Sequence, residues 1–155
     1  MNNKLIELID KKISELQRFN EITNNMLYED IDGVGQLIEE REKIVANVEG
    51  ISVEIKQYIS EQSIENQNQL NAIFTFEDIS ELNDELLQLQ DKILEQKLLR
   101  DAIKENDSNV INRLRSLQDE IISEMGISSK AKKVADYFSQ STININKGAR
   151  FNISN

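Results

Sequence analysis

The chain contains no cysteine, no histidine, no proline and no tryptophan among its 155 residues. Without Cys and His it lacks thiol nucleophiles, disulfides, thiolate zinc sites and the usual general base that titrates near neutral pH. Without Pro, and with five Gly, it has few obligatory helix breaks. These absences exclude thiol- and imidazole-based chemistry and permit long helices.

Long hydrophobic runs are also missing. No stretch approaches the ~18 consecutive apolar residues that indicate a transmembrane helix. The opening MNNKLIELIDKKISEL is more polar than a signal peptide. We therefore expect a cytoplasmic protein without membrane insertion.

Positive charge is scarce over most of the chain. Residues 1–125 hold 13 Lys/Arg and 27 Asp/Glu, a net charge of -14. This acidic body argues against a nucleic-acid partner, because it repels phosphates. Residues 126–155 hold five Lys/Arg and one acid, Asp136, a net charge of +4. We expect this basic segment either to fold back on the acidic body or to reach elsewhere.

Apolar residues recur at helical intervals and predict helices over approximately 3–28, 30–62 and 77–125. The third helix has a repeat of about 3.5 residues from Ile79 to Ile121, typical of coiled coils. The weaker pattern between about 62 and 77 indicates a connection. The predicted fold class is all-α, an antiparallel bundle or coiled coil of about three long helices.

Two segments make up the predicted organisation. Residues 1–125 form the helical bundle domain. Gly126 is a suitable helix stop, and residues 126–155 are expected to be a basic, partly disordered C-terminal segment with a short helix or mobile tail.

The stretch DIDGVGQLIEEREKI, which begins at Asp30, allows three interpretations. A calcium loop is excluded because Val34 occupies the fifth ligand position and Arg41 the twelfth. A phosphate-binding glycine motif is excluded because Ile38 stands where the third glycine belongs. The remaining interpretation is a helix start, capped by Asp30 and favoured by Asp32 at the positive end of the helix dipole.

Polar residues on the apolar seams have structural explanations. Arg41 and Arg100 lie on or beside these seams, and a buried Arg usually pairs with an acid from a neighbouring helix. The Glu-x-x-His element of di-metal bundles is impossible without His. We expect no metal site, no cofactor and no catalytic residues.

One enzyme family deserves comparison. The stretch ELNDELLQLQDKILEQKLLRDAI (Glu81–Ile103) faintly resembles the opening helix of all-helical chorismate mutases. In that family an early Arg binds a substrate carboxylate, and here Asn83 stands at that position. The sequence therefore predicts that the protein is not an enzyme.

A second resemblance spans nearly the whole chain. YEDIDGVGQLIEEREKIVANV (Tyr28–Val48), the Leu/Gln/Asn-rich third helix and the tail AKKVADYFSQSTININKGARFN resemble bacterial flagellar export chaperones of the FlgN and FliT type. The glycines at 33 and 35 depart from that family's usual residues. The resemblance implies a protein that binds a helical terminal segment of a hook–filament junction or filament cap protein in the cytoplasm and delivers it for export. The export apparatus is a further partner that it implies.

Candidate partner-binding residues are apolar side chains off the main seam of the third helix and in the tail. They are Leu87, Leu94, Leu98, Leu99, Val134, Tyr137 and Phe138. These residues can receive the apolar face of an amphipathic client helix, or the leucines can pack on the first two helices. The alternative function is a self-associating coiled-coil scaffold that uses the seam for a homodimer. Protection of Leu94–Leu99 from hydrogen exchange by a client peptide would favour the chaperone.

Overall fold

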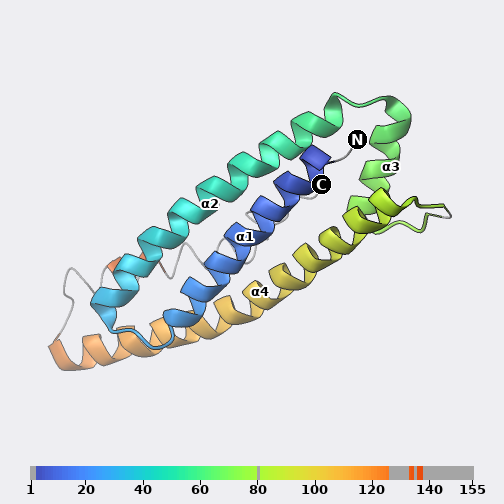
Figure 1. Ribbon diagram of the computed structural model, residues 1–155. Coiled ribbons are helices and arrows are strands. Elements are labelled where there is room, and N and C mark those ends of the chain that lie inside the picture. Colours follow the sequence, from blue (N-terminus) through green and yellow to red (C-terminus); the bar gives the residue numbers. More distant parts are fainter. Residues whose placement is uncertain (1–2, 80, 126–132, 135, 138–155) are drawn as a thin grey trace.

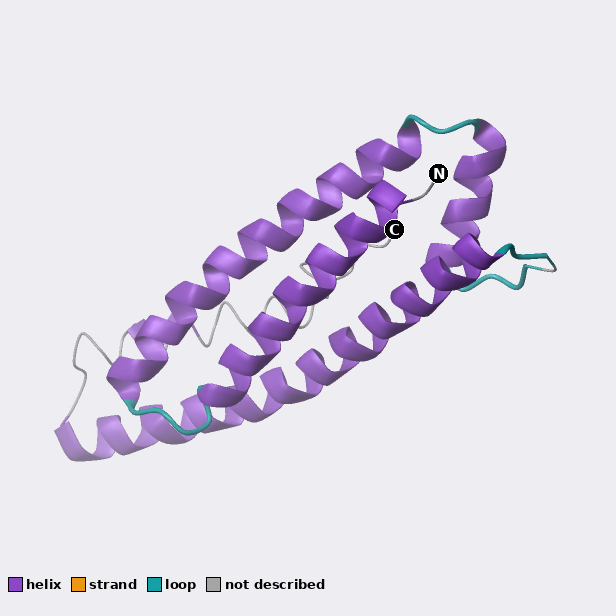
Figure 2. Cartoon of the chain, in the orientation of Figure 1, coloured by secondary structure: helices purple, strands orange, loops and turns teal. Residues whose placement is uncertain are grey.

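The computed structural model describes residues 3–79, 81–125, 133–134 and 136–137. Four helices occur in these ranges: α1 (Asn3–Asn25), α2 (Ile31–Ser60), α3 (Ile64–Phe74) and α4 (Asp84–Met125). Short loops join them (Figure 2). The predicted all-α fold class is confirmed, with one helix more than the three expected.

Helix α1 packs along both α2 and α4 and lies between them in Figure 1. Helix α3 contacts α2 and α4 near one end of the molecule, whereas close backbone approaches between α2 and α4 themselves are few. Helix α1 therefore supplies most of the packing that holds the two longest helices together.

Three polar contacts of α1, and a fourth at Met26 in the loop directly after it, fix its register against its neighbours. Towards α4, Lys92 Nζ lies 2.8 Å from Asp10 Oδ1, and Asn106 donates a 2.6 Å hydrogen bond to Asn20. Towards α2, Asn47 donates to Glu15 at 3.4 Å, and Arg41 donates to Met26 Sδ at 3.5 Å. As α1 advances, its partners on α4 rise in residue number and its partners on α2 fall.

Helix α3 occupies the stretch that the sequence analysis interpreted as a connection. The Ser63 side chain caps it by accepting a 3.3 Å hydrogen bond from the Asn66 amide. Its buried residues are only Leu70, Ile73 and Phe74, since the remainder is rich in Asn and Gln. The helix has 11 residues, of which three are buried. An apolar pattern this short does not distinguish a helix from a loop.

Helix α4 begins at Asp84 and not at the predicted residue 77, because the termination of α3 occupies the residues between. Phe76 adopts a left-handed backbone with φ of 59°. The Phe76 amide donates a 3.2 Å hydrogen bond to Ile73 O, and the Glu77 amide donates a 2.9 Å hydrogen bond to Ala72 O. This is the Schellman motif, in which the left-handed residue is usually Gly. The next helix then begins where Asn83 Oδ1 accepts a 2.9 Å hydrogen bond from the Leu86 amide.

The start of α2 confirms the capping interpretation of the glycine-containing stretch. Asp30 Oδ1 accepts a 2.8 Å hydrogen bond from the Gly33 amide, and Asp32 lies in the first turn. A Cβ at Gly33 would lie 2.4 Å from Glu29 Oε2 and 3.0 Å from Glu29 Cβ. Gly33 thus permits the close approach of the residue that precedes the cap.

The core is divided lengthwise into three hydrophobic clusters. The first joins the beginning of α1, the end of α2, α3 and the beginning of α4. The second lies at mid-length around Leu16, Phe19, Val48 and Ile103. The third lies at the other end, around Met26, Val34, Ile38, Val110, Leu114, Leu117 and Val134. None of the described helices combines the length and apolar character needed to cross a membrane.

Candidate functional site

Three of the four candidate leucines of α4 face solvent. Leu87, Leu94 and Leu98 are 44%, 46% and 61% exposed. Their spacing of seven and four residues places them on one face of the helix. We call these three residues the outer leucine stripe. The fourth candidate, Leu99, is partly buried and packs against the first and second core clusters.

The described part of the C-terminal segment lies against the third core cluster. Val134 is 2% exposed and is buried among residues of α2, α4 and the loop that follows α1, while Tyr137 packs against the same cluster. Lys133 Nζ forms a 2.9 Å ion pair with Glu39, which lowers the pKa of that exposed carboxyl through the hydrogen bond and the charge. Phe138 lies outside the described residues.

The surface that receives Val134 comes from two helices and one loop. It consists of the loop residue Met26 after α1, two residues of α2 and three of α4. We call this set the C-terminal docking surface: Met26, Val34, Ile38, Val110, Leu114 and Leu117. It is apolar, it spans the gap between α2 and α4, and it already holds a helical segment of the chain.

A buried ion pair links α2 to α4 beside this surface. Arg41 Nη2 lies 2.7 Å from Asp107 Oδ1, and the two side chains are 7% and 11% exposed. The guanidinium carbon of Arg41 lies 4.2 Å from the centre of the Phe19 ring and 5.6 Å from that of Tyr137. The prediction that Arg41 pairs with an acid from another helix is confirmed.

Burial and the charge of Arg41 have opposite effects on the ionisation of Asp107. Burial raises the pKa of Asp107, while the charge and the hydrogen bond of Arg41 oppose that rise. Such a pair fixes register more than it adds stability, because desolvation offsets most of the attraction. Arg41 therefore ties α2 to α4 at one level and presents its guanidinium between two aromatic rings.

Two more polar side chains, Lys12 of α1 and Gln96 of α4, are buried, at 2% and 0% exposed. The Asp10–Lys92 and Asn20–Asn106 contacts bracket both residues, so we treat them as a second polar level of the bundle. Burial lowers the pKa of Lys12 to about 7, with further contributions from the charges of Arg100 and Lys56. Gln96 lies on the seam repeat of the third predicted helix, between Ile93 and Ile103, whereas Lys12 was not singled out from the sequence. Its place between the buried residues Ile9 and Leu16 was the available signal.

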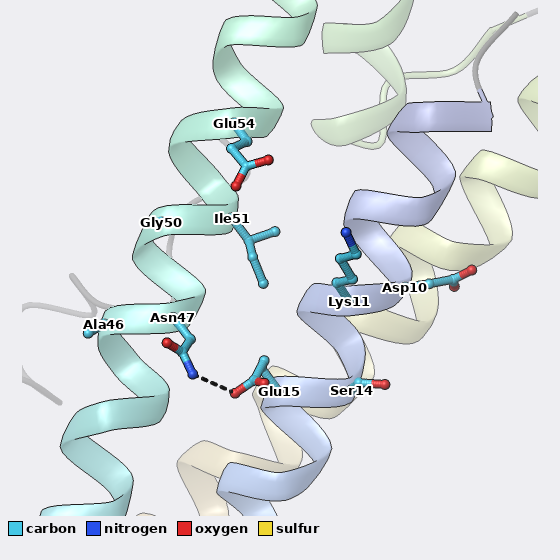
Figure 3. A pocket seen from close by; sticks show the side chains of 9 residues that line it. All are labelled: Asp10, Lys11, Ser14, Glu15, Ala46, Asn47, Gly50, Ile51 and Glu54. Carbon is cyan, nitrogen blue, oxygen red and sulfur yellow. Dashed lines mark hydrogen bonds between the residues drawn. The ribbon is translucent and has the colours of Figure 1, made fainter.

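An open cleft of about 620 Å³ lies on the surface between α1 and α2. Figure 3 shows its lining residues: Asp10, Lys11, Ser14, Glu15, Ala46, Asn47, Gly50, Ile51 and Glu54. The Asn47–Glu15 hydrogen bond crosses it. Charged and polar groups of both signs share this cleft with the apolar side chain of Ile51. Among the described residues, no three acidic side chains gather closely enough to hold a metal ion.

Comparison of the chain with protein-family models, with curated proteins and with solved structures finds no match.

Proposed function

We propose that this protein binds an amphipathic helix of a partner protein, as a cytoplasmic flagellar export chaperone of the FlgN and FliT type does for a hook–filament junction or cap protein. The observation that carries the proposal is the C-terminal docking surface. It is an apolar surface shared by α2, α4 and the loop after α1, and Val134 and Tyr137 of the C-terminal segment pack against it. Surfaces of this kind bind helices through apolar side chains spaced along one face.

The helix directions that we infer suit this role. The order of the contacts of α1 indicates that α2 runs antiparallel to α1 and α4, while α1 and α4 run parallel. A partner helix that takes the place of Val134 and Tyr137 contacts α2 and α4 together, since both helices contribute to the docking surface. The Arg41–Asp107 pair keeps these two helices at a fixed spacing.

The test uses terminal peptides of hook-associated and filament cap proteins, titrated against the full chain. We expect dissociation constants at or below about 1 μM, within the range of specific helix-in-groove complexes. Hydrogen exchange then locates the contact: binding at the docking surface protects Val110–Leu117, whereas binding at the outer leucine stripe protects Leu87–Leu98. The double variant Leu94→Glu/Leu98→Glu is the matched control and should change the affinity less than about twofold.

Three outcomes are informative. Protection of Val110–Leu117 with unchanged affinity of the double variant supports the docking surface. Loss of binding in the double variant moves the site to the outer leucine stripe. Failure of every peptide to bind rejects the flagellar proposal.

The outer leucine stripe favours a second candidate function, the self-associating scaffold. Three exposed leucines on one helix face could form a seam between two copies of the chain. However, Asp91 and Asp101 lie on the same face, so pairing two identical stripes brings like charges together. Sedimentation analysis decides this point: a dimer that Leu94→Glu/Leu98→Glu converts to monomer establishes the scaffold.

A further inference from the structure

The polar level at Lys12 differs from the one at Arg41 because no described acid forms an ion pair with the buried Lys12. Neither atom of the Gln96 side-chain amide has a hydrogen-bond partner in the part of the chain that the structure describes. No described carboxylate forms an ion pair with Lys12 either. An unpaired amide and an unpaired ammonium in a core are each unfavourable, so this level is incomplete by itself.

Helix geometry places this level on the same side of the bundle as the Arg41–Asp107 pair. Lys12 precedes Phe19 by seven residues on α1, and Gln96 precedes Asp107 by 11 residues on α4. Seven and eleven residues are close to two and three turns, so each pair shares a helix face. Phe19 and Asp107 are two of the groups that contact the Arg41 guanidinium. Lys12 and Gln96 therefore lie on the same side of α1 and α4 as the groups around Arg41, further along the bundle.

Cations from all three long helices meet at this level. Lys12 comes from α1, and the two charges that act on it, Arg100 and Lys56, come from α4 and α2. Arg100 is half-buried and Lys56 is exposed, so they form the side of the level that opens to solvent. This concentration of positive charge lies inside a domain with 27 Asp/Glu and 13 Lys/Arg. At the neighbouring level, by contrast, Asp107 neutralises Arg41.

We propose that Lys12, Gln96 and Arg100 form a binding site for a carboxylate, supplied by an Asp or Glu side chain of the partner helix. A carboxylate accepts hydrogen bonds from ammonium, guanidinium and amide donors alike, and these charge-assisted bonds are the stronger kind. Arg100 retains its interaction with Asp101, since a guanidinium has five donors. The carboxylate would pair with the buried Lys12 ammonium, as Asp107 pairs with the Arg41 guanidinium.

The carboxylate site adds a requirement on the sequence of the partner helix. The site itself does not depend on the proposed function; only the source of the carboxylate, a partner helix, rests on it. The residues from Gln96 to Val110 span roughly 21 Å of α4. A helix lying along α4 must therefore carry its acid about 14 residues from the apolar side chain that contacts Val110.

The first experiment uses sodium acetate as the probe, with sodium chloride at equal ionic strength as the reference. If acetate binds with a dissociation constant of about 10 mM, 100 mM acetate should raise the wild-type melting temperature by roughly 3–6 °C. Lys12→Met and Gln96→Leu should each lose this rise. Lys11→Met, the same change at the exposed neighbouring position, should keep it. Carbon-13 NMR of the lysine Cε groups should also show the pKa of Lys12 moving upward as acetate is added, because a nearby anion favours the ammonium form.

Equal acetate effects in the wild type and in Lys12→Met would overturn the proposal, because they would reflect general exclusion of salt. The acetate experiment needs no partner helix, so its failure leaves helix binding at the docking surface standing.

A second arm identifies the source of the carboxylate. In any terminal peptide that binds, acidic residues are replaced one at a time by Gln. A tenfold or greater loss at one position in the wild type, and none in Lys12→Met, supports a carboxylate from the partner. An acetate effect without any such position supports the site and overturns the partner as its source.

Discussion

Replacing Lys12 by methionine should make the protein more stable at neutral pH, although it removes a buried side chain. In the folded protein the Lys12 ammonium is 2% exposed and has no acidic partner among the described residues. Burial first, and then the charges of Arg100 and Lys56, lower its pKa from 10.5 to about 7. Gln96, the other buried polar residue of this level, carries no charge to offset the lowering of the Lys12 pKa.

The magnitude follows from linkage between protonation and folding. Since the folded pKa is below the unfolded one, the unfolded chain binds more protons between pH 7 and 10.5, and stability rises with pH in that window. A lowering from 10.5 to about 7 corresponds to at most about 5 kcal/mol of destabilisation once the pH is below 7. Local relaxation reduces that figure, and exchanges of buried charged groups for apolar ones gain up to about 4 kcal/mol. We expect Lys12→Met to raise the free energy of unfolding by roughly 2–4 kcal/mol at pH 7.

Urea unfolding followed by far-ultraviolet circular dichroism, repeated across the window from pH 7 to 10, measures this effect. The advantage of Lys12→Met over the wild type should shrink by up to about 1.4 kcal/mol per pH unit, the slope for one proton. Lys11→Met serves as the control, because it removes the same charge from an exposed position in the same helix turn. A Lys12→Met variant less stable than the wild type at pH 7, or an advantage that does not change with pH, would refute the reasoning.

Three further changes test other parts of the structure by the same unfolding measurement. Asp107→Ala should destabilise the protein by about 3–5 kcal/mol, because it leaves the Arg41 guanidinium buried without its acid; a loss below 1 kcal/mol would mean that Arg41 reaches water instead. Asp30→Ala should cost about 1 kcal/mol through loss of the α2 cap, whereas Asp30→Ser should cost only a few tenths. Leu94→Glu/Leu98→Glu should stay within about 0.5 kcal/mol of the wild type, since both side chains face solvent; strong destabilisation would place them in a core or a dimer interface.

Periodic and strictly local features were accessible from the sequence. The buried seam of α4, including Leu86, Leu89, Ile93 and Ile103, follows from the helical repeat, because a helix presents the same face every three to four residues. The cap at Asp30 likewise depends only on groups within one turn. Helix α3 escaped detection because its three core residues give too weak a periodic signal.

The sequence by itself determined that the chain folds as helices, which faces are apolar, and that a buried Arg41 requires an acid. Only the tertiary structure decided that this acid is Asp107, 66 residues away, and that no acid among the described residues pairs with Lys12. It also decided that Leu99 is packed inside while Leu94 and Leu98 face outward. The physical reason is that helical phase is set by neighbours three and four residues apart, whereas partners across helices depend on how whole helices align. Which charges pair, which side chains are exposed and where the candidate binding surface lies all depend on that alignment.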